Sequence, residues 1–265
     1  MAPAYLDEIV QSHRQRSAQD SRDWRSRAGV IHFDGPSFAL ALRRGSSPYV
    51  KVVAEIKRRS PSKGALAPDL DVAEMACAYR DAGASAVSVL TDREFFDGSL
   101  EDLATVRAAI NLPVLRKDFT VSENDVLDAA EAGASAILLI VAVLTDHELV
   151  TFVELAEQCG LDAVVEVHDA EEARRAIACG ARIVGVNQRD LRTFAVDTRE
   201  AASVIDVLPK ECLAVCESGL SAVGDVERAA QLGFDAVLVG EAFVVASDPR
   251  ATVRAFTVVP SVLRG

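Results

Sequence analysis

The chain has 265 residues, 50% of them hydrophobic and 26% charged, which is the composition of a soluble globular protein. A net charge of −12 and a pI of about 4.8 argue against nucleic acid or an anionic membrane surface as the main partner. No apolar run reaches the length of a membrane span, and the N-terminus lacks the apolar core of a signal peptide.

About 47 residues precede the first expected strand. They predict a helix over about 4–18, a polar linker and a short helix near 36–44. A short unit then recurs, in which a helix ends on a glycine and an apolar strand follows two to four residues later, as in AGASA before VSVL. Strands are expected near 51–57, 86–91, 113–117, 135–141, 163–167, 182–187, 213–217 and 235–240. Amphipathic helices are expected at 70–82, 122–132, 146–158, 169–179, 197–207 and 222–232.

Strands that are apolar on both faces and alternate with helices indicate a parallel sheet covered by helices. Eight such units favour a closed (β/α)8 TIM barrel over an open doubly wound sheet. The absence of a GxGxxG sequence after the first strand weakens the dinucleotide-binding alternative. We therefore predict an α/β protein of one domain over 1–265, with an N-terminal helical extension (1–47) and a barrel (48–265).

The first expected strand carries two charges. Glu55 and Lys57 are two residues apart and so project from the same face. Such a pair is costly in an apolar strand unless the ions serve each other or a ligand. A structural ion pair and a catalytic strand end are equally consistent with this segment alone.

The other strands also end on polar groups. In this fold, chemistry lies at the carboxyl ends of the strands. Three carboxylates and two ammonium groups at one barrel mouth would be unfavourable without a polar ligand, although each residue alone could be structural. The carboxylates would keep the lysines protonated, which suits a general acid and argues mildly against imine chemistry. The polar strand ends are Glu55, Lys57, Thr91, Lys117, Glu166, Asn187, Glu217, Ser218 and Gly240.

Several loops could hold a phosphate. Ser60 and Lys63 follow the first strand, and Ser218-Gly219 and Gly240 open onto helix N-termini after the last two strands, where this fold often binds phosphate. The SPSKG segment is not a P-loop, because its first glycine is missing and its order is Lys-Gly. Cations near the mouth could steer an anionic substrate or could simply be solvated. These are Arg58, Arg59, Lys63 and Arg116.

Histidines, aromatic residues and cysteines give weaker signals. His168 could support Glu166, but a structural strand-end role is favoured, and His13 is predicted to lie at the surface. Phe95 and Phe96 could cover an aromatic substrate or pack within their loop. Five cysteines form no CxxC pair, so we expect buried, reduced thiols in a cytoplasmic protein with no metal site.

Seven segments occur in order at the expected strand ends, and together they resemble the indole-3-glycerol-phosphate synthase family of tryptophan biosynthesis. The N-terminal YLDEIVQSHRQR and SFALALR resemble the helices that precede the barrel in that family, so the resemblance covers nearly the whole chain. The seven segments are EIKRRSPSKG, LTDREFFDGSLEDL, LPVLRKDF, VEVHDAEEA, GVNQRDLRTF, CESGL and VLVGEAF.

The resemblance implies a carboxy-lyase that converts 1-(2-carboxyphenylamino)-1-deoxyribulose 5-phosphate to indole-3-glycerol phosphate, CO₂ and water, with no cofactor. Lys117 would be the general acid of ring closure and Glu166 would move protons in the dehydration. Beyond its anionic substrate, the protein would have no nucleic-acid or membrane partner and at most transient association with other tryptophan-pathway enzymes. Glu55 and Lys57 would complete the catalytic cluster, Asn187, Arg189 and Ser218 would position the substrate, and Ser60, Gly219, Gly240 and Glu241 would hold its phosphate. The expected binding set also includes Lys57, Phe96, Phe119 and Glu217.

Some positions depart from the family pattern without removing a proposed catalytic group. They could alter the phosphate loop or the helix behind Lys117. Two alternatives remain: a phosphosugar isomerase, disfavoured because no cysteine ends the first strand, and a phosphate-binding relative without turnover, disfavoured by the intact charged set. The departures are Arg59, Asn124-Asp125, Gln188 and Phe243-Val244.

Overall fold

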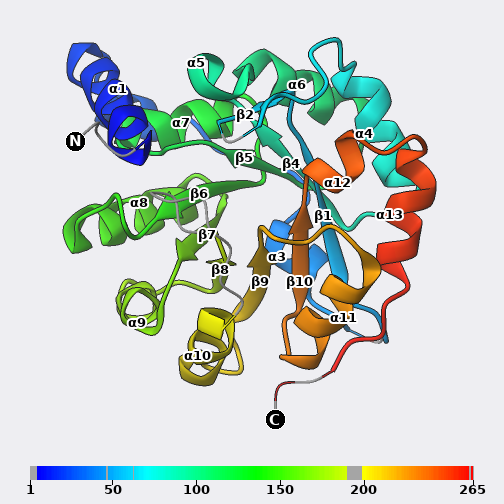
Figure 1. Ribbon diagram of the computed structural model, residues 1–265. Helices are drawn as coiled ribbons and strands as arrows, with labels where there is room; N and C mark the ends of the chain where they lie inside the picture. Colours follow the sequence, from blue (N-terminus) through cyan, green and yellow to red (C-terminus); the bar gives the residue numbers. More distant parts are fainter. Residues whose placement is uncertain (1–4, 46, 62, 190–198, 263, 265) are drawn as a thin grey trace.

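Eight parallel strands close into a barrel in the computed structural model, which describes residues 5–45, 47–61, 63–189, 199–262 and 264. Their order is β1-β10-β9-β8-β7-β6-β5-β4, and β1 pairs with both β10 and β4 (Figure 1). This confirms the predicted (β/α)8 fold. The barrel strands are β1 (Lys51–Ile56), β4 (Ala86–Leu90), β5 (Val114–Lys117), β6 (Ala136–Ile140), β7 (Asp162–Val167), β8 (Ile183–Asn187), β9 (Leu213–Glu217) and β10 (Ala236–Val239).

Successive side chains of each strand face opposite sides, which explains why the strands are apolar throughout. Val53 and Leu115 belong to the cluster inside the barrel, whereas Val52 and Val114 belong to the cluster beneath the helices. The parallel register places strand ends at the same level, as in the pairing of Asn187 with Glu217. The polar side chains at the strand ends therefore meet at one mouth of the barrel.

Helices surround the barrel as predicted, and their ends follow from local sequence signals. Ser122 and Thr145 form capping boxes at the starts of α7 and α8. The glycine of each of the five recurring units adopts a positive φ between 78° and 94°. The helices of the barrel region are α4 (Val72–Asp81), α5 (Arg93–Phe96), α6 (Leu100–Ala109), α7 (Glu123–Glu131), α8 (Asp146–Gln158), α9 (Ala170–Ala178), α10 (Arg199–Val207), α11 (Val223–Gln231), α12 (Glu241–Val244) and α13 (Pro249–Thr257). The first two residues of the helix expected at 197–207 lie outside the described residues.

The described part of the N-terminal extension contains three helices: α1 (Tyr5–Gln19), α2 (Trp24–Ala28) and α3 (Phe38–Leu42). The stretch predicted as a polar linker includes α2, because Asp23 caps this turn and Trp24 packs against the core. Phe38 and Leu42 of α3 join the apolar cluster inside the barrel. Asp162 at the start of β7 accepts hydrogen bonds from Ser37 Oγ and the Ala39 amide, so α3 closes the N-terminal end of the barrel.

Two short strands, β2 (Arg59–Ser60) and β3 (Gly64–Ala65), form an antiparallel pair in the loop after β1. This pairing holds Ser60 at the mouth of the barrel, where it is buried.

Within the described part of the chain, no helix is long and apolar enough to cross a membrane.

Candidate active site

A cavity of about 540 Å³ lies at the carboxyl ends of the barrel strands, and every residue that the family resemblance assigned to the site lines it. The structure thus brings these residues together, while their individual roles stay predictions. The predicted residues on its wall are Glu55, Lys57, Ser60, Phe96, Lys117, Phe119, Glu166, Asn187, Arg189, Glu217, Ser218, Gly219, Gly240 and Glu241. Of the other polar strand ends, Thr91 does not line the cavity: its hydroxyl donates to Asp118 and accepts from Arg116.

Lys117, the last residue of β5, is surrounded by carboxylates. Its Nζ lies 3.1 Å from Glu166 Oε2 and 3.5 Å from Glu217 Oε2. Burial favours the neutral amine, but the charges of Glu166, Glu217 and Glu55 outweigh it and raise the pKa of the Lys117 ammonium. Lys117 is therefore a cation with a proton to donate, as the sequence predicted.

Glu166 at the end of β7 is held in its ionised form although only 1% of it is exposed. Burial would raise its pKa, but the charges of Lys117 and His168 and a hydrogen bond from Asn187 lower it overall. Asn187 Nδ2 donates to Glu166 Oε1 at 3.1 Å, and Asn187 Oδ1 accepts from the Arg189 amide at 3.0 Å. This relay orients Glu166 as a hydrogen-bond and proton acceptor.

Glu217 at the end of β9 differs from Glu166 although both contact Lys117. Burial, which is the largest effect, and the neighbouring charges of Glu166 and Glu55 raise the pKa of Glu217 to about 8, with Lys117 opposing them. Its Oε1 atom is buried and lacks a hydrogen-bond partner within the described structure. A Cβ at Gly185 would lie 2.1 Å from this oxygen, so a glycine is required beside it. The site therefore combines a carboxylate, Glu166, with a carboxylic acid, Glu217.

Glu55 and Lys57 form the ion pair that their spacing predicted, with Lys57 Nζ 2.7 Å from Glu55 Oε1. A Cβ at Gly240 would approach Glu55 Oε1 to 2.4 Å, so the glycine after β10 makes room for this carboxylate. Tyr79 donates its hydroxyl proton to the Glu55 carbonyl at 3.3 Å and steadies the strand end from behind. Both side chains line the cavity, so the pair belongs to the site rather than to the outer rim of the strand.

The loops after β1, β9 and β10 line one side of the cavity. Ser60 Oγ is buried and has no partner among the described atoms. Ser218 and Gly219 adopt consecutive left-handed conformations, with φ of 65° and 70°, and for a serine this conformation costs about 1 kcal/mol. Lys63 forms an ion pair with Glu241 across the same opening. Hydroxyl, backbone and ammonium groups therefore face a shared polar end of the cavity.

Aromatic side chains from the loops after β4 and β5 form another part of the wall. The rings of Phe96 and Phe119 lie 6.5 Å apart, and both line the cavity. Phe95 does not reach it, because its ring is buried edge-on against Tyr5 of α1 at 5.6 Å. Of the two neighbouring phenylalanines, Phe96 therefore faces the cavity and Phe95 packs within the fold.

Most of the cations expected near the mouth have structural partners instead. Arg58 makes a bidentate pair with Asp102, and Arg116 is buried with Asp118 on the helix side of β5. Arg59 is exposed and does not line the cavity. Burial raises the pKa of the Tyr5 hydroxyl in α1 and the charge of Arg59 partly opposes this rise, so Arg59 lies near α1. Of the four cations, Lys63 alone is among the described residues that line the cavity.

The remaining departures from the family pattern also have local structural explanations. Asn124 accepts a hydrogen bond from Arg27 and donates to the Arg22 carbonyl, and so docks the extension onto α7. Gln188 donates to Cys216 Sγ at 2.6 Å, and Phe243 packs against Tyr79 and Phe256. These contacts lie behind the cavity and leave its charged groups in place.

Three other histidine and aspartate positions were not assigned to the site from sequence. Asp92 and Asp118 line the cavity, and His13, predicted at the surface, is 5% exposed and contacts both of them. The signal for His13 was its helical spacing from Leu6 and Ile9, which are also buried. His168 contacts Glu172 of α9 through its amide and Nδ1, as the favoured structural interpretation expected, and its charge also lowers the pKa of Glu166.

Fold and site together define a class: a (β/α)8-barrel enzyme with acid and base groups at the carboxyl ends of its strands. The model of the indole-3-glycerol phosphate synthase family matches residues 5–256. A protein of that name from Parafrankia is 51% identical over 248 residues, covering 92% of each chain, and one from Nocardioides is 44% identical over 97% of this chain and 99% of its own. The chain belongs to the indole-3-glycerol phosphate synthase family.

Solved structures with lower similarity support the fold alone. A 3-hexulose-6-phosphate synthase superposes with a TM-score of 0.63 at 16% identity, covering 80% of this chain and 100% of its own. A thiamine phosphate pyrophosphorylase from Pyrococcus furiosus gives 0.61 at 17% identity, covering 78% and 93%. At these identities the likeness concerns the barrel and not the chemistry.

Proposed function

We propose that the protein is an indole-3-glycerol phosphate synthase that closes, decarboxylates and dehydrates 1-(2-carboxyphenylamino)-1-deoxyribulose 5-phosphate. The observation that carries the proposal is the position of Lys117 between Glu166 and Glu217 in a cavity that also has a polar end and an aromatic wall. Family membership supports the same reaction.

In ring closure, a carbon of the aromatic ring attacks the sugar carbonyl, whose oxygen gains negative charge. The Lys117 ammonium would donate a proton to this oxygen, and loss of CO₂ would then restore the aromatic ring. A raised pKa keeps Lys117 charged in the free enzyme, and a bound carboxylate and phosphate would preserve that state. The proposed acid is therefore ready before the substrate arrives.

Dehydration removes the hydroxyl group produced by ring closure as water. Glu166 is ionised and fixed by Asn187, so it is suited to accept the proton that must leave the ring carbon or nitrogen. Glu217, with its raised pKa, would stay protonated at neutral pH and donate a hydrogen bond to the substrate. Glu55 would orient Lys57 toward the anionic substrate through their ion pair.

The two ends of the cavity suit the two ends of this substrate. Ser60 Oγ and the backbone amides of Gly219, Gly240 and Glu241 would bind the phosphate, and Arg189 and Ser218 would position the carboxylate. Phe96 and Phe119 would cover the aromatic ring. The support is the unpartnered Ser60 hydroxyl at one end and the pair of rings at the other.

We also propose that the extension and the barrel act as one domain. Helix α3 of the extension fills the N-terminal end of the barrel, and Asn124 binds the guanidinium group of Arg27 and the carbonyl group of Arg22 in the extension. No cofactor is required by this chemistry, since ring closure, loss of CO₂ and loss of water need only proton transfers and the formation and cleavage of bonds within the substrate. Transient association with other tryptophan-pathway enzymes stays a prediction.

The test is conversion of the substrate by the purified protein in the presence of a chelator. We expect indole fluorescence to appear together with one CO₂ per product. A correctly folded protein that releases neither product would contradict the proposal, and tight binding of indole-3-glycerol phosphate without turnover would identify a binding protein instead.

A further inference from the structure

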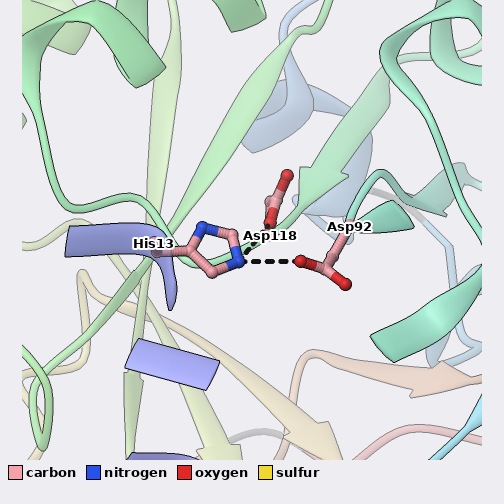
Figure 2. Close-up of side chains that lie close together, drawn as sticks. All are labelled: His13, Asp92 and Asp118. Atoms are coloured by element: carbon pink, nitrogen blue, oxygen red, sulfur yellow. Dashed lines mark hydrogen bonds and ion pairs between the residues drawn. The ribbon is translucent and has the colours of Figure 1, made fainter. Parts of the chain in front are cut away.

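Helix α1 inserts a histidine between the two loops that carry the aromatic wall of the cavity. His13 Nε2 lies 2.8 Å from Asp92 Oδ2 and 3.7 Å from Asp118 Oδ1, and Figure 2 shows the ring pointing toward both carboxylates. The three side chains are at most 5% exposed. This contact joins the N-terminal extension to the loops after β4 and β5.

The contact combines two carboxylates, Asp92 and Asp118, with two basic side chains, His13 and the neighbouring Arg116. Arg16 of α1, which is 53% exposed, approaches Asp92 only to 3.5 Å. Burial would raise the pKa of Asp118, but Arg116 and His13 lower it overall. A buried carboxylate without such a cation would be destabilising.

The same three side chains have the spacing of a metal site, since their ligand atoms lie within 4.8 Å of one another. Their oxygens are already occupied: Asp92 accepts from the Phe95 amide and His13, and Asp118 accepts from Thr91 Oγ1 and Arg116. A guanidinium in contact with a carboxylate also opposes a second cation there. A hydrogen bond between His13 and Asp92 therefore fits the cluster better than a metal ion.

The cluster holds both aromatic residues of the cavity. Asp92 Oδ1 accepts the Phe95 amide at 2.6 Å and caps α5, the short helix that ends in Phe96. Asp118 accepts the Phe119 amide at 2.8 Å, and the Phe119 ring lies 5.4 Å from the His13 ring. Asp118 also accepts hydrogen bonds from the side chains of Thr91 and Arg116. The shortest contact of Asp92 with another side chain is the one with His13. Loss of His13 should therefore loosen α5 more than β5.

We propose that His13 is a positioning residue: it ties the loops after β4 and β5 to α1 and so fixes the wall of Phe96 and Phe119 against the substrate ring. This inference rests on the proposed function for its kinetic consequence, but the position of α5 can be measured without turnover. Lys117 keeps its own contacts, so the effect should fall on substrate binding rather than on proton transfer.

The experiment compares His13→Leu and His13→Lys with Arg14→Ala, which removes a neighbouring contact of α1 with Glu148 and the Val121 carbonyl. For His13→Leu we expect KM to rise about tenfold, as for the loss of one hydrogen bond to a charged group, with kcat changed by less than about twofold. Amides of residues 93–98 should exchange hydrogen faster. His13→Lys, which restores a cation, should recover both values, and Arg14→Ala should change neither.

An unchanged KM and unchanged exchange in folded His13→Leu would overturn the inference, as would an equal KM increase in Arg14→Ala. A rise in the melting temperature of the wild-type protein on addition of Zn²⁺, reversed by a chelator, would overturn it in favour of a metal site. If His13→Leu does not fold, His13→Gln replaces it, with a smaller increase in KM and in exchange expected. Absence of turnover in the wild-type protein would refute the proposed function, while the exchange measurement would still test the role of His13.

Discussion

Two buried clusters of carboxylates and cations lie on either side of the loops after β4 and β5, and they differ in how completely their hydrogen bonds are satisfied. Around Lys117, the Oε1 atom of Glu217 has no partner in the described structure, and neither has the hydroxyl of Ser60 nearby. Around His13, the carboxylates of Asp92 and Asp118 accept bonds at every oxygen.

Buried polar atoms without partners are rare in native proteins, because each costs about 1–3 kcal/mol. Two such atoms, Glu217 Oε1 and Ser60 Oγ, belong to residues that line the cavity, where a bound ligand would satisfy them. The saturated cluster at the extension instead stabilises a conformation. Two sites of similar composition thus have different functions, and hydrogen-bond saturation distinguishes them better than charge does.

The unsaturated cluster consists of Lys117, Glu166 and Glu217, and removing its central cation, Lys117, should have the largest effect. Lys117→Ala should lower kcat by about 10²–10⁴-fold, because it removes a positioned general acid. The fold should persist, since Glu217 can stay protonated and relieve the repulsion among the carboxylates. Steady-state kinetics and a thermal unfolding curve would measure both, with Lys51→Ala at the opposite end of β1 as the matched control. Turnover within tenfold of wild type would exclude Lys117 as the acid.

In the saturated cluster of His13, Asp92 and Asp118, removing one charge should lower the free energy of unfolding. Asp118→Asn leaves the buried Arg116 without its charged partner and should lower the free energy of unfolding by about 3 kcal/mol. Urea denaturation of wild type and variant measures this difference. A loss below about 1 kcal/mol would show that the network around Asp118 is not a stabilising element.

Glu217 should make the stability of the unsaturated cluster depend on pH. Its pKa is raised to about 8 in the folded state, so its contribution is fully present below about pH 4.5 and is lost as the pH rises to about 8. Glu217→Gln removes this titration. Between pH 5 and 8.5 the melting temperature of the wild-type protein should fall further than that of the variant. The extra fall should be about 2–4 °C for each kcal/mol of folding free energy that protonated Glu217 contributes. Parallel pH profiles would show that Glu217 does not titrate in this range.

The smallest effect is expected outside both clusters. His168 lies close in sequence to Glu166 but contacts Glu172 of α9. His168→Asn should leave kcat/KM within about twofold of wild type, in line with substitutions away from functional features. A decrease beyond tenfold would extend the unsaturated cluster to this histidine.

The strands, the barrel and the set of residues at its mouth could be predicted from the sequence, because apolar continuity and strand-end position are local signals. The prediction for Arg116 was wrong because side chains alternate along a strand: Leu115 and Lys117 face the barrel interior, so Arg116 faces the helices. The prediction for His13 was wrong because His13 lies on the same buried helix face as Leu6 and Ile9. Arg116 has one partner, Asp118, two residues away, but Thr91 lies 25 positions away. The partners of His13, Asp92 and Asp118, lie 79 and 105 positions away, and no local pattern encodes such pairing.

The most direct test of the contrast between the clusters is a structure with bound indole-3-glycerol phosphate. We expect a phosphate oxygen within hydrogen-bond distance of Ser60 Oγ, a ligand or water contact to Glu217 Oε1, and the indole ring against Phe96 and Phe119. The contacts among His13, Asp92 and Asp118 should be unchanged. A ligand bound elsewhere, or one that leaves Ser60 Oγ and Glu217 Oε1 without partners, would contradict the claim that unsatisfied groups mark the active site.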